Sequence, residues 1–294
     1  MVGEAAIATV GLTKHFGRVV ALDGLDLEVH SGEVFGFLGP NGSGKTTTIR
    51  LLLGLIHPTR GSATILGIPV GDVERAHRHV GYVPGDVAMW PQLTGTEVLD
   101  LLGNVSGAVD AGFRTELLER LNVDPSPRMR SFSKGNRQKI ALVAAFMSRP
   151  DVLLLDEPTA GLDPLMEEQF QQLARDAAAR GQTIFLSSHI LDEVQDLCDR
   201  VGILRAGRLV EVAALDDLRR IGATIVEVLI EGPVPSLDGV PGVTAVEAVP
   251  GVAGGLRISV TGSPSALIAR LAEVPVLRIR TDEPSLEEIF LTYY

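Results

Sequence analysis

The segment from Gly39 to Thr47 reads GPNGSGKTT, which fits the pattern G-x-x-x-x-G-K-[ST] of a phosphate-binding loop. Its glycines let successive backbone N–H groups curl around phosphate oxygens, and a helix that begins at the loop adds its positive dipole end. We expect Lys45 to reach the β- and γ-phosphates of a nucleoside triphosphate and the Thr46 hydroxyl to ligate Mg²⁺. The residues expected to bind the nucleotide here are Gly39, Asn41, Gly42, Ser43, Gly44, Lys45, Thr46 and Thr47.

Two acidic residues, Asp156 and Glu157, follow the apolar run of residues 152–155 and form the second candidate for chemistry. Asp156 is expected to hold Mg²⁺, directly or through water, and Glu157 to polarise the attacking water as a general base. Adjacent carboxylates that point into one site repel each other unless a cation lies between them. The alternative is a strand that happens to end in acidic residues.

Three further features are ambiguous when each is taken alone. Ser133 is a good N-cap, so the sequence SKGNRQ predicts either a well-capped helix or a helix N-terminus that offers a hydroxyl and N–H groups to a γ-phosphate. Residues 160–163, AGLD, predict a tight turn directly after the acidic pair. His189 follows the next apolar run, where a neutral imidazole can contact a γ-phosphate or water, although a lone histidine is more often structural.

The elements around these motifs must bring them together. Residues 34–38 read as a buried strand and residues 48–53 as the first turns of a helix, a context that disfavours a glycine-rich turn that binds nothing. The apolar run before Asp156 fits a strand buried on both faces of a parallel sheet, with the acidic pair at the edge where such sheets bind ligands. A helix over 164–180 and a strand over 183–186 follow. This alternation predicts an α/β fold with a parallel sheet and covering helices.

The segments before and between these motifs predict two smaller parts. Residues 4–10 and 18–29 alternate as two strands of an antiparallel ribbon. Phe16 lies between them and is either a core aromatic, as most phenylalanines are, or a platform on which an adenine stacks. Helical spacing recurs in residues 94–105, 113–121 and 134–147.

The composition of the chain changes near residue 215. Apolar runs typical of strands occupy residues 224–230, 242–248, 256–260 and 275–280, and helical segments occupy 264–273 and 284–292. We therefore predict two domains. Residues 1–215 form the catalytic domain, with a helical subdomain at about 86–150, and residues 216–294 form a small α+β domain for which a split-βαβ sandwich is one arrangement.

Charge and composition exclude several classes of protein. The formal net charge is -11, so non-specific electrostatic binding of nucleic acid is not expected. Cys198 is the only cysteine, which excludes an intrachain disulfide and suits a reducing cytosol. The N-terminus lacks the basic region of a signal peptide, and the longest apolar runs, such as 140–147, are shorter than the ~20 residues of a spanning helix. We therefore expect a second chain to supply any membrane-spanning part.

With its motifs in this order, residues 5–215 resemble the nucleotide-binding subunits of ATP-binding-cassette (ABC) transporters. The resemblance implies a P-loop NTPase core with an antiparallel β subdomain and a helical subdomain. It also implies ATP and Mg²⁺ as ligands, a homodimer formed through the ATP sites, and a separate transmembrane permease. The residues that it places at the reacting nucleotide are the adenine-stacking Phe16, Ser133 and Gly135 of the signature, the catalytic Glu157, Asp163 of the D-loop and the switch His189.

The signature departs from the family pattern. Its usual sequence is LSGGQ, whereas residues 132–136 read FSKGN. The serine and the second glycine, which face phosphate in the family, are kept. Lys134 adds a charge and Asn136 shortens the final side chain, so we expect the hydrolysis rate and coupling to be affected more than ATP binding.

The loop that follows Tyr82-Val83-Pro84 departs as well. The family has a glutamine at this point, whereas this chain has Gly85 followed by Asp86. Gly85 has no side chain to offer Mg²⁺ or water. We expect Asp86 either to substitute as a hard oxygen ligand of Mg²⁺ or to contact the membrane subunit.

The end of the chain indicates a direction of transport. Residues 284–291, PSLEEIFL, resemble the C-terminal extension of the daunorubicin-type drug-resistance exporter ATPases. We expect an ATP-hydrolysing subunit of a multidrug or small-molecule exporter, cytoplasmic and peripheral on the inner face of the cell membrane through its permease. The alternative is a soluble ABC ATPase that acts on ribosomes or DNA, but such relatives carry tandem cassettes, long coiled coils or zinc modules. A small-molecule phosphoryl transferase leaves the signature and the D-loop unexplained.

Overall fold

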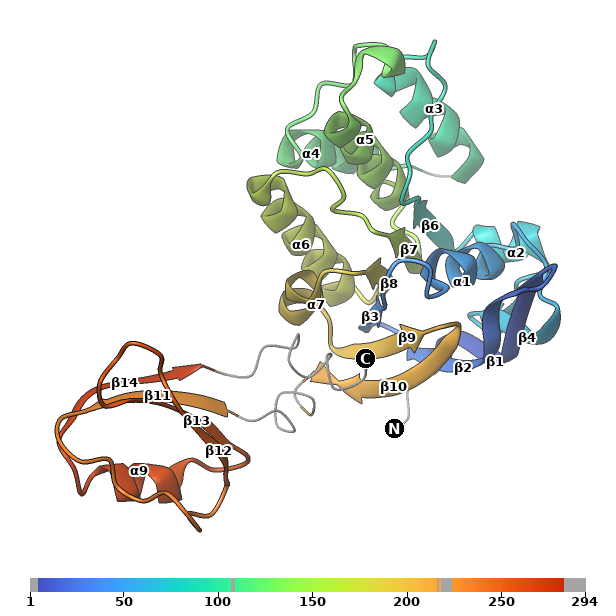
Figure 1. The fold of residues 1–294 in the computed structure, drawn as a ribbon. Helices are drawn as coiled ribbons and strands as arrows, with labels where there is room; N and C mark the ends of the chain where they lie inside the picture. Colours follow the sequence, from blue (N-terminus) through green and yellow to red (C-terminus); the bar gives the residue numbers. More distant parts are fainter. Residues whose placement is uncertain (1–4, 107–108, 216, 218–223, 283–294) are drawn as a thin grey trace. The chain divides into compact units, whose positions relative to one another are not determined.

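The computed structural model describes residues 5–106, 109–215, 217 and 224–282 of the chain. The chain divides into two compact units, Met1–Val212 and Ala213–Tyr294. Figure 1 shows the first unit in blue, green and yellow and the second in orange and red.

The core of the first unit is a six-stranded sheet with the order β10-β9-β3-β8-β7-β6. Its strands are β3 (Val34–Leu38), β6 (Val80–Val83), β7 (Val152–Asp156), β8 (Thr183–Ser188), β9 (Arg200–Arg205) and β10 (Arg208–Ala214). Strands β9, β3, β8, β7 and β6 run parallel to one another. Every residue of β3 and β7 is buried, because this sheet is covered on both faces. Polar groups of these two strands are therefore confined to the places where the strands end.

Helices pack against this sheet. They are α1 (Lys45–Leu52), α2 (Val73–His77), α5 (Lys134–Phe146), α6 (Pro164–Ala179) and α7 (Leu191–Leu197). Of these, α5 and α6 begin at side-chain N-caps, Ser133 and Asp163. The N-cap of α6 is Asp163, whose carboxylate accepts the Met166 N–H at 3.1 Å, and Pro164 occupies the first turn. The remaining helical part consists of α3 (Gly95–Ser106), α4 (Ala111–Arg120), the short 3₁₀ turn Met129–Ser131 and the beginning of α5.

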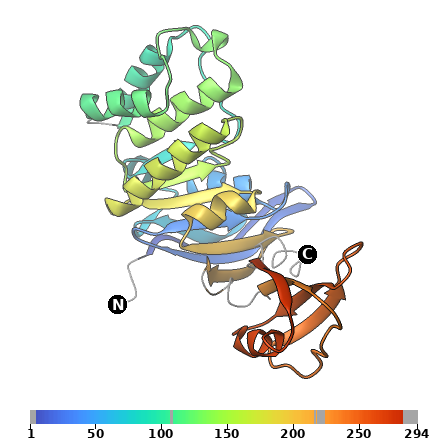
Figure 2. The same cartoon turned by 90° about the vertical axis from the view of Figure 1, so that its left-hand side faces the viewer.

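A capping box starts α3. The Thr94 hydroxyl accepts the Glu97 N–H at 3.1 Å, and the Glu97 carboxylate accepts the Thr94 N–H at 2.7 Å. Figures 1 and 2 show α3 to α5, drawn in green, at one end of the unit and the first strands, drawn in blue, at the other. The helical part and the antiparallel part are therefore separate regions of the first unit.

The antiparallel part has the strand order β2-β1-β4-β5. Its strands are β1 (Ala5–Phe16), β2 (Val19–His30), β4 (Arg60–Ile65) and β5 (Ile68–Pro69). Buried side chains of β1, β2 and β4 join those of β3 in one core cluster. Within it, the rings of Phe35 and Phe185 stack with their centroids 5.9 Å apart, and Phe37 lies 5.1 Å from Phe185. This cluster fixes β3, and with it the start of the phosphate-binding loop.

The second unit is a four-stranded antiparallel sheet with the order β12-β13-β11-β14. Its elements are β11 (Thr224–Ile230), β12 (Val243–Ala248), β13 (Gly255–Val260), α9 (Ser265–Leu271) and β14 (Val276–Asp282). The helix covers one face of the sheet, where Val226, Val228 and Ile258 pack against Leu267 and Leu271. The unit therefore has its own apolar core, built from one face only.

This architecture confirms the predicted α/β class with its parallel sheet, antiparallel ribbon and helical part. The strand predicted over 34–38 matches β3 residue for residue. The sequence analysis did not single out the helix α7 or the strands β9 and β10, and these two strands complete the sheet beyond His189. The helix predicted over 284–292 lies outside the described residues, and the assignment of domains at 1–215 and 216–294 stays a prediction.

Candidate functional site

The phosphate-loop segment joins the end of β3 to the start of α1 and requires glycine at two positions. A Cβ added at Gly39 would collide with the Leu204 carbonyl oxygen, and one added at Gly44 would lie 2.7 Å from the Ala21 carbonyl oxygen. Gly44 also has a φ of 117°, which side-chain-bearing residues rarely adopt. Asn41, Gly42 and Thr46 are exposed, and Thr47 is half-buried. The loop is therefore pressed against neighbouring strands while its outer residues face solvent.

Lys45 is the buried cation of this loop. Its side chain is 5% exposed, and its Nζ donates to the Gly39 carbonyl oxygen at 2.6 Å and lies 3.9 Å from Glu157 Oε1. Burial lowers the pKa of Lys45, and the carboxylates of Glu157 and Asp156 oppose that shift. Ser43 Oγ is also buried and has no hydrogen-bond partner among the described residues. A buried ammonium and an unpaired buried hydroxyl in one loop fit an anionic ligand with several acceptor oxygens.

The acidic pair lies at the carboxyl ends of β7 and β8. Asp156 is 2% exposed, and the Ser187 hydroxyl donates to its Oδ1 at 2.6 Å. Glu157 has a φ of 47°, a left-handed conformation that is strained for a residue with a side chain, and its N–H donates to the Ser187 carbonyl oxygen at 3.1 Å. Its Oε1 lies 3.0 Å from His189 Nδ1. The structure therefore brings Lys45, Asp156, Glu157 and His189 to one edge of the sheet.

Glu193 of α7 joins the two loops that carry the acidic pair and the histidine. The Thr159 hydroxyl donates to its Oε1 at 2.5 Å, and the Ser188 hydroxyl donates to its Oε2 at 2.7 Å. Thr159 lies two positions after Glu157, and Ser188 directly precedes His189. Because hydrogen bonds to a carboxylate are short and strong, one side chain sets the spacing of both loops.

The N-terminus of α5 holds the signature residues. The Ser133 hydroxyl accepts the Asn136 N–H at 3.2 Å, so it caps the helix as one reading of the sequence predicted, and its own proton remains available to donate. Both side chains are exposed. A Cβ added at Gly135 would lie 2.6 Å from the Gly161 carbonyl oxygen, so the signature packs directly on the turn that leads to Asp163. This contact explains why position 135 requires glycine.

Phe16 is not a core residue. It is 50% exposed at the end of β1, and Lys14 Nζ lies 5.0 Å from the centroid of its ring. The structure thus excludes the core alternative, and the adenine platform stays a prediction.

Gly85 faces the buried carboxylate of the acidic pair. A Cβ added at Gly85 would lie 3.4 Å from Asp156 Oδ2, an ordinary van der Waals contact, so a Cβ fits there without displacing a neighbour. Burial raises the pKa of Tyr82 on the preceding strand, and the charge of Asp156 adds to the shift. The Asp86 side chain is exposed, and its proposed role at Mg²⁺ or at a membrane subunit stays a prediction.

The sequence analysis missed the residues that hold the site together. Ser187, Ser188 and Thr159 are buried or half-buried hydroxyls at the strand ends, and Glu193 is four positions after His189 on a helix. The polar pair of serines at the end of an apolar run was the available signal. Ser187 donates to Asp156, whereas Ser188 and Thr159 donate to Glu193. These partners meet only once the strand ends and α7 have packed together, which no local pattern encodes.

A sequence profile described as "ABC transporter" matches residues 22–160. The linearmycin resistance ATP-binding protein LnrL of Bacillus subtilis (strain 168) is 31% identical over 302 residues, which cover 95% of each chain. The chain belongs to the ABC transporter family. A Nod factor export ATP-binding protein I of Rhizobium sp. (strain N33) is 34% identical to this ABC chain, over 98% of the chain and 96% of the relative. An uncharacterised ABC transporter ATP-binding protein of Nostoc sp. is 40% identical, and this chain spans only 62% of its length.

Solved structures agree with the family assignment. An ATP-binding subunit of an ABC transporter superposes with a TM-score of 0.69 and 32% identity, over 73% of this chain and 92% of that one. A dimeric ATP-binding cassette in a post-hydrolysis state, bound to ADP and Pi, superposes with a TM-score of 0.65 and 25% identity, over 71% and 98%. This ABC chain is therefore an ATP-binding ATPase. None of the helices in the described ranges has the length and apolar composition needed to cross a membrane.

Proposed function

We propose that this ABC ATPase hydrolyses ATP to drive a separate transmembrane permease that exports drugs or other small molecules. The observation that carries the proposal is the position of the Glu157 carboxylate, 3.0 Å from His189 Nδ1 and 3.9 Å from the phosphate-loop ammonium of Lys45. A carboxylate beside a phosphate-binding lysine is placed to activate water for attack on a γ-phosphate.

Each residue of the site has a separate role in phosphoryl transfer. Lys45 exchanges its contact with the Gly39 carbonyl oxygen for the β- and γ-phosphates, and the loop N–H groups hold the remaining phosphate oxygens. Glu157 accepts the proton of the attacking water. His189, hydrogen-bonded to Glu157 through Nδ1, orients that carboxylate and offers its other ring nitrogen to the γ-phosphate or to water. The strained backbone of Glu157 is consistent with a residue held in place for reaction.

The oxygen donors of the site fit a magnesium ion. The Thr46 hydroxyl and the Asp156 carboxylate are hard ligands of the kind that Mg²⁺ prefers. Asp156 Oδ1 accepts the Ser187 hydroxyl, which leaves Oδ2 for a ligand, and Gly85 keeps the space beside Oδ2 free of a side chain. The ion, when bound, neutralises negative charge on the β- and γ-phosphates. Exposed Asp86 is a second candidate oxygen ligand beside this space.

A second copy of the chain completes each ATP site in this proposal. Ser133 and Asn136 are exposed at the N-terminus of α5, where N–H groups and the helix dipole favour a phosphate. Asp163 caps the adjoining α6 and holds the turn that Gly135 touches. Exposed Phe16 offers its ring to the adenine. The dimeric cassette with ADP and Pi supports this arrangement, since its likeness to the chain covers 98% of that structure.

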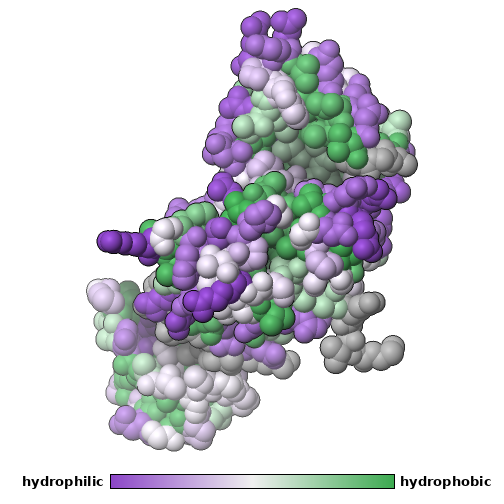
Figure 3. Space-filling view, turned by 90° about the vertical axis from the view of Figure 1, so that its right-hand side faces the viewer, coloured by the Kyte–Doolittle hydropathy of each residue, from purple (hydrophilic) through white to green (hydrophobic). Residues whose placement is uncertain are grey.

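Export through a permease is supported by the relatives and by the surface of the helical part. One relative is named for linearmycin resistance and another for Nod factor export. In the first unit, Trp90, Leu101 and Val105 are 51%, 39% and 79% exposed. Figure 3 shows apolar side chains, drawn in green, gathered on the face that contains the helical part. Apolar surface of this kind suits a protein partner, and we place the permease there, which would hold the chain at the inner face of the cell membrane.

The oligomeric state of the protein with ATP bound tests whether a second copy of the chain completes each ATP site, which we call the composite site. Glu157→Gln should bind ATP, hydrolyse it slowly and run as a dimer in light scattering coupled to size-exclusion chromatography. Adding Ser133→Arg in that background should return the protein to a monomer that still binds ATP, whereas Ser126→Arg, an exposed serine in the loop before α5, should leave the dimer intact. A dimer that persists with Ser133→Arg would overturn the composite site.

A further inference from the structure

The sheet of the second unit has a face that α9 does not cover. Val226, Val228 and Ile230 of β11 point into the core beneath α9, so the alternating Glu227 and Leu229 project to the opposite face. Across the sheet, Glu227 pairs with Arg257 of β13 and Arg280 of β14. Leu229 pairs with Gly255 and Arg278 in the next row.

This arrangement leaves one guanidinium without a carboxylate. The row of Glu227 alternates in charge, with an arginine on each side of the acid. The row of Arg278 contains only Leu229 and Gly255, neither of which can balance its charge. Among the described residues, the guanidinium of Arg278 forms no ion pair or hydrogen bond. It is an exposed cation next to apolar side chains in a chain whose formal net charge is -11.

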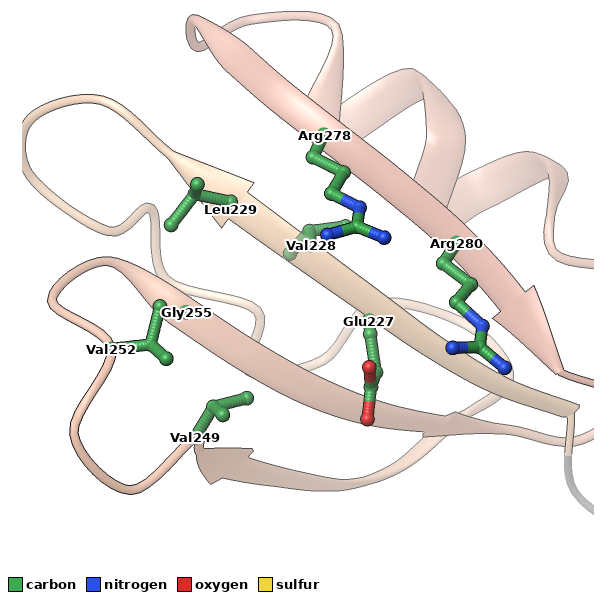
Figure 4. A pocket seen from close by; sticks show the side chains of 8 residues that line it. All are labelled: Glu227, Val228, Leu229, Val249, Val252, Gly255, Arg278 and Arg280. Carbon is green, nitrogen blue, oxygen red and sulfur yellow. The ribbon is translucent and has the colours of Figure 1, made fainter.

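A cavity of about 210 Å³ lies beside this guanidinium. Its apolar wall comes from Leu229 and from the turn between β12 and β13, where Val249 and Val252 close over Gly255. A Cβ added at Gly255 would lie 2.9 Å from Val252 Cγ1, so the missing side chain is what lets the turn fold over the strand. Figure 4 shows Arg278 and Arg280 reaching from β14 toward β11 on the same side of the sheet as the Glu227 carboxylate.

We propose that this cavity binds a small organic monocarboxylate with a compact apolar body. The carboxylate pairs with Arg278, whose planar fork suits two parallel hydrogen bonds, and the apolar body packs on Leu229, Val249 and Val252. The size agrees, because an apolar cavity of ~150 Å³ is enough for benzene. Glu227, flanked by Arg257 and Arg280, disfavours ligands with a second negative charge at that end.

Benzoate is a suitable probe because its ring and carboxylate match the two halves of the cavity. Titration of the full chain, labelled on its Leu and Val methyl groups and followed by NMR, should give saturable shifts at Leu229, Val249 and Val252 with a Kd of about 1 mM or tighter. Benzylamine and benzyl alcohol have the same body with a cation or a neutral group. Each should bind at least about tenfold more weakly, since each lacks the charge-assisted contact.

Variants separate the contribution of charge from that of the apolar wall. Arg278→Ala should weaken benzoate at least about tenfold, Arg278→Lys less, and Val252→Asp should abolish saturable binding by placing a like charge in the wall. Arg257→Ala removes the same charge from the same face outside the cavity and should change the Kd less than about threefold. All three positions are exposed, so the unit should stay folded.

Two results would overturn the proposal. One is benzoate binding that is unchanged in Arg278→Ala or matched by benzyl alcohol. The other is complete competition by inorganic sulfate at concentrations equal to those of benzoate, because the apolar wall would then contribute nothing.

Discussion

The six-stranded sheet of the first unit and the sheet of the second unit of this ABC ATPase present their polar side chains in opposite ways. In the first unit both faces of β7 are buried, so polar chemistry begins where the strand ends, at Asp156 and Glu157. In the second unit α9 covers a single face of the sheet, and the other face carries Glu227 and Arg278 in the middle of strands. A sheet covered on both sides confines its chemistry to an edge, whereas a half-covered sheet offers a surface.

The difference extends to how firmly each set of side chains is held. At the edge of β7 and β8, Asp156 is 2% exposed and hydrogen-bonded to Ser187, and Glu193 bridges the neighbouring loops. In the second unit Val252 is 46% exposed, and the Arg278 guanidinium has no hydrogen-bond partner among the described residues. The edge is organised before a ligand arrives, so small changes around it should alter catalysis. The open face should respond only to changes in the residues that touch its ligand.

Lys45→Ala is the variant with the largest expected effect on ligand binding at the edge. Without the ammonium, ATP should bind about 100-fold more weakly, since a buried charge-assisted contact to phosphate is lost. Benzoate binding to the second unit should not change. Arg278→Ala should instead weaken benzoate binding and leave the affinity for ATP unchanged. Isothermal titration of both ligands to both variants measures the four affinities. If either variant weakens the binding of both ligands, the two sites are not independent, which would contradict the separation of the two units drawn above.

Glu193→Ala tests whether the edge depends on the bridge between its loops. Thr159 and Ser188 would lose their shared acceptor, so the spacing of Glu157 and His189 would relax and kcat should fall about tenfold. The KM for ATP should change little, because Glu193 lies outside the phosphate loop.

The matched control for this prediction is Asp196→Ala. Asp196 lies on the same helix and is exposed, and its side chain has no hydrogen bond to another element in the described part of the chain, whereas its backbone carbonyl oxygen accepts from Arg175. A steady-state ATPase assay should therefore find its kcat unchanged. Equal losses in the two variants would mean that α7 acts only through general stability.

Gly85→Gln should have the smallest effect of these variants. The position accepts a Cβ 3.4 Å from Asp156 Oδ2, so an amide oxygen there could join the ligands of Mg²⁺. The Mg²⁺ concentration for half-maximal ATPase activity should fall roughly threefold. Gly85→Ala fills the same space without an oxygen and should leave the Mg²⁺ dependence as in the wild type. A loss of activity in both variants would show that the space must stay open.

The same comparison explains what could be predicted from the sequence. In the first unit, acidic residues directly after the unbroken run of 152–155 stand out, and the strand predicted over 34–38 is the observed β3. The resemblance to the ABC family further predicted the P-loop NTPase core and the likeness to exporter ATPases. The contacts of Glu193 were not predictable, because they join segments that meet only after β7, β8 and α7 have packed.

In the second unit, the proposed binding face could not be predicted from the alternating pattern of its strands. The alternation of Glu227 and Leu229 with buried valines is what any half-covered strand has, so no residue is conspicuous. The cavity arises from register, which places Arg278 opposite Leu229, and from the glycine at 255 that lets the turn close. Register between strands distant in sequence cannot be read from composition or local spacing.

Single-turnover hydrolysis of ATP by Glu157→Gln tests the account most directly. The amide preserves the size of the side chain and cannot accept the proton of the attacking water. We predict a rate about 10²–10⁴-fold below that of the wild type, with an ATP affinity within about threefold of it. A Glu157→Gln protein that cleaves bound ATP at the wild-type rate would contradict the assignment of Glu157 as the general base at this edge of the sheet.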